Sequence, residues 1–300
     1  MNGLGALIRR NTKLYFKDKG MFFSSLITPM ILLVLYATFL KKVYDDSFTS
    51  ALEKAGVSIS DAVINGCVGG QLISSLLAVS CVTVAFCSNL LMIRDKTGGA
   101  RYDLTITPVR FGTLGLSYYL STLVSTLIIS FSAAAVSLVY LRTVGWYLTL
   151  ADVGLMLLDV FLLTMFGTAL SSCINFFLTT DAQASAVGTI VSAGYGFICG
   201  AYMPISNFGE GLQKVLSFLP GTYGTSLLHN HAMRGVFEAM RDEGFPPEVV
   251  ESIRDSVDCN LSFFGNDVSI GAMYAILGGS TLLLIGVYVV MNVIAGKRER

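Results

Sequence analysis

The chain has 300 residues, of which 53% are hydrophobic and only 13% are charged. Soluble domains carry about 25% charged residues, and here the charges are confined to short stretches between long uncharged ones. Its 20 basic and 20 acidic residues give a formal net charge of zero, so there is no global basic field to attract nucleic acid. The composition predicts a polytopic membrane protein with the lipid bilayer, and no nucleic acid, as its partner.

Residues 1–20 predict an amphipathic helix that lies along the membrane surface. Leu7 and Leu14 fall on one face at helical spacing, whereas Arg9 and Lys13 fall on the opposite face. An apolar stripe opposite a basic face is typical of helices that lie in the plane of the lipid headgroups. The alternative is a helix that packs against another subunit.

Six uncharged or nearly uncharged runs follow, and each is long enough to cross a hydrocarbon core of about 30 Å. The expected fold is therefore an all-α membrane protein with six transmembrane helices. Pro29 lies inside the first run and is tolerated in a spanning helix as a kink. The runs cover residues 21–40, 67–93, 111–141, 153–178, 182–203 and 270–296.

The distribution of Lys and Arg predicts how these runs are oriented. Twelve basic residues lie in the N-terminal segment, in the connection between the second and third runs, and at the C-terminus. The loops of the other side carry eight, spread over far more residues, and the connection between the fifth and sixth runs is acidic. Positive charge favours the cytoplasmic side, so both termini are expected in the cytoplasm.

The connection at residues 94–110 is short, carries charges of both signs and turns at Gly98. A brief helix is expected from Ala100 to Ile106, ended by Pro108. A rigid charged helix of this kind can dock into a soluble partner, while an ordinary loop that only sets the topology is the alternative. The docking candidates are Arg94, Asp95, Lys96, Gly98, Arg101, Asp103, Leu104 and Pro108.

Two features inside the apolar runs are candidates for a transport pathway or for helix packing. Small residues recur every four positions at Gly188, Ser192, Gly196 and Gly200, which lets another helix approach closely. This spacing fits packing within the monomer, a subunit interface or a gated pathway. Asp159 is an acid inside an apolar run, and an intramembrane carboxylate is a candidate proton or cation contact. Its place early in the fourth run also fits a position near the outer interface.

The connection between the fifth and sixth runs predicts a helical hairpin followed by a polar segment. Two amphipathic stretches follow Pro204 and are separated by Pro220 and Gly221. Two such helices directly after a span suggest a hairpin that re-enters the outer leaflet, with a hairpin lying on the surface as the alternative. The rest of residues 204–269 is acidic and is expected to form a small external elaboration.

No catalytic or metal-binding motif is visible in the sequence. His229 and His231 are the only histidines, and at a spacing of two they point away from each other on a helix. The 6 cysteines form no CxxC pair. No G-x-x-x-x-G-K-[ST] sequence is present, so no phosphate-binding P-loop is expected. We therefore expect a chain that binds no metal or cofactor and catalyses no reaction itself.

Taken together, these features resemble the ABC-2 type permease family, the membrane subunits of bacterial ABC exporters. The basic start, the six spans, the charged connection and the re-entrant hairpin match the family plan over nearly the whole chain. Two segments carry more specific resemblances, one to the coupling segment and one to the signature near the external hairpin. They are Asp95-Lys96-Thr97-Gly98 with Asp103-Leu104 and Thr107-Pro108-Val109, and Tyr202-Met203-Pro204-Ile205 with Leu219-Pro220-Gly221-Thr222-Tyr223.

The resemblance implies a mechanism. A separate ATP-binding subunit would hold ATP and Mg and would dock on residues 94–110 and on the N-terminal helix. Two permease chains, as a homodimer or a heterodimer, would form a pathway from the first, second and fifth spans. The chain would export a lipophilic, drug-like, peptide or lipid-linked substrate across the bacterial inner membrane, as multidrug exporters do.

Two other classes of function stay open from the residues themselves. An ion-coupled secondary transporter would use Asp159 and would need no ATPase. A membrane receptor or scaffold would bind a ligand through the acidic external segment. Transport that persists without an ATPase but is lost in Asp159→Asn would favour the carrier.

Overall fold

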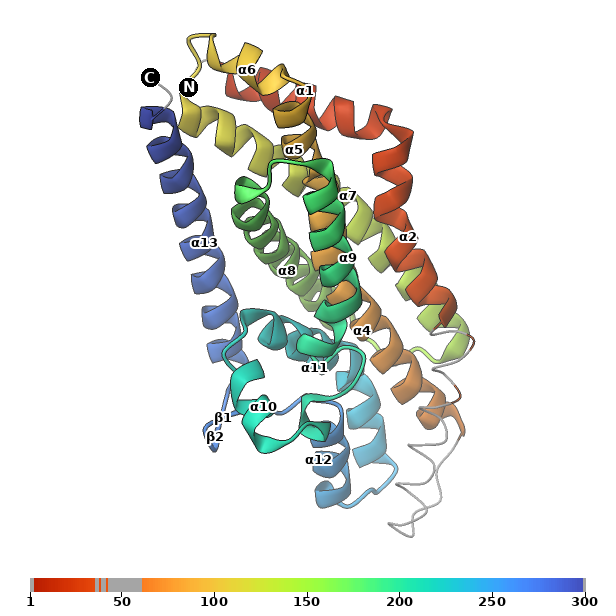
Figure 1. Ribbon diagram of the computed structural model, residues 1–300. Helices are drawn as coiled ribbons and strands as arrows, with labels where there is room; N and C mark the ends of the chain where they lie inside the picture. The colour runs from red at the N-terminus through yellow and green to blue at the C-terminus, as the bar shows by residue number, and fades with distance from the viewer. Residues whose placement is uncertain (1–2, 36–37, 39–41, 43–60, 299–300) are drawn as a thin grey trace.

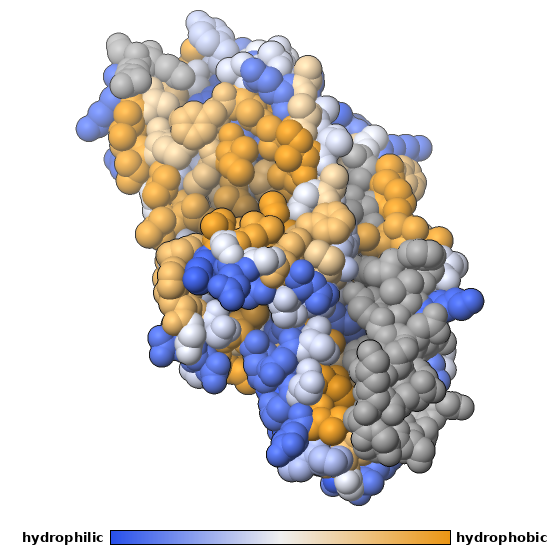
Figure 2. All heavy atoms as spheres, turned by 60° about the horizontal axis from the view of Figure 1, so that its bottom comes forward, coloured by the Kyte–Doolittle hydropathy of each residue, from blue (hydrophilic) through white to orange (hydrophobic). Residues whose placement is uncertain are grey.

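The computed structural model describes residues 3–35, 38, 42 and 61–298. Long helices form an elongated bundle, with the first helix and the end of the last helix at one end and several short helices at the other (Figure 1). We call the first of these the terminal end and the second the distal end. Viewed from the distal end, hydrophilic atoms gather over the short helices, and an apolar surface covers the adjoining flank of the bundle (Figure 2).

The first two helices meet at a sharp bend. α1 (Leu4–Lys17) and α2 (Lys19–Leu35) form an angle of 77°. Asp18 lies at the bend in an extended conformation, and its side chain accepts a hydrogen bond from the Met21 N–H at 3.0 Å, which caps the start of α2. α1 packs against α7 of the same chain and buries Leu7 and Tyr15 there, so part of its apolar stripe is covered by protein.

Within the described ranges, four helices are long and apolar enough to cross a membrane, or five if the bent α1–α2 pair counts as one span. α9 (Asp181–Ile198) is not among them, and α2 is described over 17 residues, so the structure supports four or five of the six expected spans. The four are α4 (Asp61–Ser88) continued by α5 (Leu90–Thr97), α7 (Phe111–Val144), α8 (Leu150–Phe177) and α13 (Ile270–Arg298).

α4 is the central helix of the bundle. In its most apolar stretch, 83% of the residues are buried, against 22% for α13 at the periphery. α4 packs against α2, α7, α8, α9 and α11, and its apolar side chains form the middle of the main core. A helix that is apolar all round is expected to be buried on all sides, which α4 illustrates.

The distal end is built from short elements that follow α9. These are the 3₁₀ helix η2 (Ile205–Asn207), α10 (Glu210–Leu216), α11 (Pro220–Asp242) and α12 (Pro247–Ser256). α11 is buried along most of its length against α4, α8 and α13. The described residues contain one sheet, an antiparallel pair of β1 (Ser262–Phe263) and β2 (Asn266–Asp267) with Ser262 opposite Asp267 and Phe263 opposite Asn266.

Candidate functional site

A short helix protrudes from the terminal end between α5 and α7. α6 (Ala100–Thr105) has no buried residue, and it lies beside α1 at the top of Figure 1. Tyr102 and Ile106 are 71% and 70% exposed, and Asp103 is also exposed. Gly99 has a φ of 80°, which favours glycine and allows the tight turn out of α5. Large apolar side chains that stay exposed next to an acid are typical of a protein-docking surface.

The charged residue Asp95, just before α6, binds within the chain. It is 6% exposed. Its Oδ2 accepts hydrogen bonds from Arg10 Nη1 at 2.6 Å and from the Tyr118 hydroxyl at 2.6 Å. This network joins α1, α5 and α7, so it fixes the base from which α6 protrudes.

Arg94 and Lys96 are also engaged inside the chain. Arg94 forms an ion pair with Asp18 at the bend between α1 and α2. The Lys96 ammonium donates to the carbonyls of Phe176 at 2.6 Å and Leu178 at 3.1 Å, at the C-terminal end of α8. Unpaired carbonyls at a helix C-terminus favour a cation, so Lys96 caps α8. The structure therefore gives Arg94, Asp95 and Lys96 anchoring contacts.

The other docking candidates lie around α6. Gly98 ends α5 and Pro108 follows α6, and both are exposed. Leu104 is half-buried against the cluster that includes Leu7 and Tyr118. Arg101 is half-buried and lines a cavity of about 490 Å³ beside α6, together with Lys96, Tyr102, Thr105, Phe176, Thr179 and Ala295. Sequence reasoning missed Tyr102 and Ile106, although two large apolar residues in a charged connection were a usable signal.

The buried acid Asp159 lies where α8, α11 and α13 meet. It is fully buried. Its Oδ2 is 2.6 Å from His231 Nδ1, and its Oδ1 accepts a hydrogen bond from the Tyr274 hydroxyl at 2.6 Å. His229 points elsewhere and lies 3.3 Å from the Ser75 hydroxyl of α4. Asp159 thus holds α11 between two apolar helices, and no sequence pattern indicated His231 as its partner.

The small-residue face of α9 divides into two halves. A Cβ added at Gly188 would meet nothing within 4 Å, and Ser192 is half-buried, so this half is open. A Cβ at Gly196 would collide with the Tyr202 ring. A Cβ at Gly200, where φ is +82°, would lie 2.8 Å from Asp258 Oδ2. The Gly196 half is therefore filled by the chain itself, whereas no described residue covers the Gly188 half.

The prolines of the expected hairpin mark helix starts. Pro204 precedes η2, and Pro220 occupies the first turn of α11, where its missing N–H removes no helical hydrogen bond. At Gly221 the backbone approaches the Tyr195 side chain of α9 so closely that a Cβ would collide with the hydroxyl. The two helices α10 and α11 are thus separated by a turn before Pro220, and the first turn of α11 touches α9 at Tyr195.

Asp258, after α12, fastens the distal segment to the turn that follows α9. It is buried, and its carboxylate accepts from the backbone N–H groups of Ile205 at 2.5 Å and Ser206 at 3.4 Å. Burial raises the pKa of Asp258 to about 6, although both N–H bonds favour the charged form. The neighbouring Cys259 carbonyl accepts from the Asn230 amide at 2.6 Å, which ties the same segment to α11.

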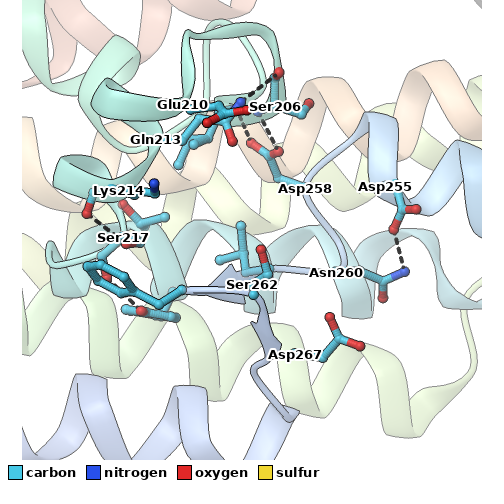
Figure 3. A pocket seen from close by; sticks show the side chains of 16 residues that line it. Ser206, Glu210, Gln213, Lys214, Ser217, Asp255, Asp258, Asn260, Ser262 and Asp267 are labelled. Carbon is cyan, nitrogen blue, oxygen red and sulfur yellow. Dashed lines mark hydrogen bonds between the residues drawn. The ribbon is translucent and has the colours of Figure 1, made fainter.

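A polar cavity of about 590 Å³ adjoins this contact, between α10 and the β1–β2 hairpin. Figure 3 shows Asp258 next to Ser206, with Glu210 and Gln213 on the neighbouring helix. The lining carries the carboxylates of Glu210, Asp255, Asp258 and Asp267, and the ammonium of Lys214. Its charge favours cations over anions.

No group of three or more His, Cys, Asp or Glu side chains suited to a metal ion occurs in the part of the chain that the structure describes. The chain matches no curated protein. It does match the family model described as ABC-2 type transporter, over residues 2–231. This range includes α1, the segment around α6, Asp159 and most of α9 to α11, and it covers well over half of the chain. The chain belongs to the ABC-2 type transporter family.

Proposed function

We propose that this permease works as the membrane subunit of an ATP-driven exporter and that α6 is its coupling helix. Membrane subunits of this family normally act with an ATP-binding subunit. The exposure of Tyr102 and Ile106 at the tip of the terminal end carries the proposal. Apolar and aromatic side chains of this kind form the cores of protein interfaces, and the cavity beside α6 would receive part of the partner. ATP and Mg would be held by that partner.

The contacts around α6 give a route for force. α5 follows α4 after a single residue, Asn89, whose amide donates to the hydroxyls of Ser171 and Ser172 in α8 at 3.1 and 3.0 Å. The Arg10–Asp95 pair ties α5 to α1. A displacement of α6 would thus pass through α5 to the central helix α4 and, through Arg10, to the N-terminal helix.

The proposed orientation places the terminal end in the cytoplasm of a bacterial cell, with the inner membrane around the long helices. The concentration of Lys and Arg in short segments at this end supports it. α1 would lie along the inner surface. α11, which is buried against the long helices, fits a segment that re-enters the outer half of the membrane.

A second permease chain, identical or different, would pack at the open half of α9. Gly188 and Ser192 lie there, and no described residue comes within 4 Å of a Cβ added at Gly188. Small residues of this kind allow close helix approach. The substrate would be lipophilic: drug-like, peptide or lipid-linked. The competing proposal, an ion-coupled carrier that uses Asp159, is less well supported because both carboxylate oxygens already have partners within the chain.

The decisive experiment is co-purification of the chain with the ATPase expressed beside it. The double variant Tyr102→Ala/Ile106→Ala should lose the ATPase and ATP-dependent transport, while the chain itself stays folded because both side chains are exposed. Phe264→Ala is the matched control, since Phe264 is 56% exposed at the distal end. Retention of the ATPase by the double variant would refute the role of α6, and transport that needs no ATPase would refute the exporter.

A further inference from the structure

A second cavity at the distal end has the opposite charge to the first. It lies where α11, α12 and the start of α13 meet, and its volume is about 250 Å³. Arg234, Arg241 and Arg254 line it together with one carboxylate, Glu238. Apart from Asn230 and His231, its lining residues lie beyond residue 231, where the match to the family model ends.

The three guanidinium groups offer more hydrogen-bond donors than their partners use. Each carries five N–H donors. Arg234 donates to Glu238 at 3.1 Å, Arg241 to Glu251 at 3.2 Å, and Arg254 to the Asn230 side-chain oxygen at 3.2 Å. Glu251 also forms an ion pair with Arg254 Nη1 at 3.7 Å. Among the residues described, Arg254 Nε is buried and meets no acceptor. An anion that entered the cavity would supply acceptors to these donors.

The arginines are held in place before any ligand arrives. Arg254 lies over the Phe237 ring at 5.8 Å, and Asn230, which orients it, is itself fixed by the Cys259 carbonyl. Arg234 Nη1 is 3.6 Å from Asp152, a buried acid at the start of α8. Donors that are already ordered lose little conformational entropy on binding, so the site is preorganised.

The geometry points to a phosphate group as the ligand of this cavity. A guanidinium presents a planar fork that binds two phosphate oxygens at once, and three such forks surround one small cavity. The phosphate would belong either to a lipid headgroup or to a free phosphate. Ile270, 43% exposed, lies at the cavity and begins the apolar helix α13, along which the chains of a lipid would extend. We propose that the distal end binds phosphate here.

Calorimetric titration of the detergent-purified permease with its ATPase partner tests the proposal. The probes are short-chain phosphatidylglycerol below its micelle concentration and, separately, inorganic phosphate. Saturable binding of the lipid alone supports a headgroup site, and equal binding of inorganic phosphate supports a site for free phosphate. Absence of binding by both probes overturns the proposal.

Three variants connect the binding to the cavity. Arg241→Gln/Arg254→Gln should weaken binding by about tenfold or more, because each charge-assisted bond is a strong one. Glu238→Gln should tighten it, which a folding defect would not do. Arg142→Gln is the matched control, since Arg142 stacks on Trp146 and does not line the cavity. Unchanged binding in the double variant, or an equal loss in Arg142→Gln, would contradict the site.

Discussion

The two ends of the bundle use their charged residues differently. At the terminal end, Arg94, Asp95 and Lys96 are engaged inside the chain, and the apolar side chains of Tyr102 and Ile106 are largely exposed. At the distal end, charged side chains line two cavities of opposite sign. A surface with exposed apolar groups is stabilised by a protein partner, whereas a charged cavity is stable in water and attracts ions. The contrast teaches that a charge-rich connection can anchor a helix instead of forming the docking surface itself.

Removing the buried carboxylate of Asp159 should have the largest effect on stability. Asp159→Ala would leave the buried His231 and the half-buried Tyr274 without their shared acceptor, and breaking a buried pair costs about 4 kcal/mol. We expect the free energy of unfolding in mixed micelles to fall by that amount. The milder Asp159→Asn should keep ATP-dependent transport, and loss of transport in a folded Asp159→Asn protein would instead favour the ion-coupled carrier.

The buried Asp258 should make the distal end sensitive to pH. Its folded pKa of about 6 lies above the ordinary value of 3.8, so the folded protein holds the proton more tightly. The resulting stability is complete below about pH 4 and is lost as the pH rises through 6, by at most about 3 kcal/mol. Melting temperatures of the protein and of Asp258→Asn should therefore diverge between pH 4 and 7. Asp255→Asn, at an exposed position of α12, is the control, and parallel curves for Asp258→Asn would contradict this role.

At the terminal end, substitutions of Asp95 and Asp18 compare how much a buried and an exposed carboxylate contribute to the free energy of unfolding. Asp95→Ala would leave Tyr118 without its acceptor in a buried network, so a loss of about 2 kcal/mol is expected. Asp18→Ala removes an exposed ion pair with Arg94 and a helix cap, so about 1 kcal/mol or less is expected. Equal losses in denaturant titrations of the two variants would show that the Asp95 network does not anchor α1.

The two halves of α9 should respond differently to the same substitution. Gly196→Leu would collide with Tyr202 and should lower the free energy of unfolding by about 1 to 3 kcal/mol. Gly188→Leu meets open space, so the single chain should stay as stable as before. If a second permease packs there, Gly188→Leu should reduce dimers in size-exclusion chromatography with light scattering, whereas Gly196→Leu tests only the contact inside the chain.

Local patterns predicted much of the chain well. The runs at 111–141, 153–178 and 270–296 coincide with α7, α8 and α13 to within three residues, and the brief helix expected from Ala100 to Ile106 is α6, at Ala100–Thr105. The end of the first run, 21–40, lies largely outside the described residues. The docking set stays a prediction, and the structure adds that its members Arg94, Asp95 and Lys96 have contacts within the chain. In α9, Gly188 and Gly196 belong to the same four-residue repeat of small residues. Gly188 nevertheless faces open space, whereas Gly196 faces the Tyr202 ring. Helical periodicity places side chains on a face but does not say what covers that face.

Most helices, the apolar segments and the family plan could be predicted from the amino-acid sequence, because hydrophobic runs and turn residues act over short distances. Which charged side chains pair with one another within the chain depends on the tertiary structure. Asp95 meets Arg10 across 85 positions of sequence, and Asp159 meets His231 across 72. Such pairs form because a buried carboxylate is stable only with a partner, and the packing of helices selects which distant residue that partner is.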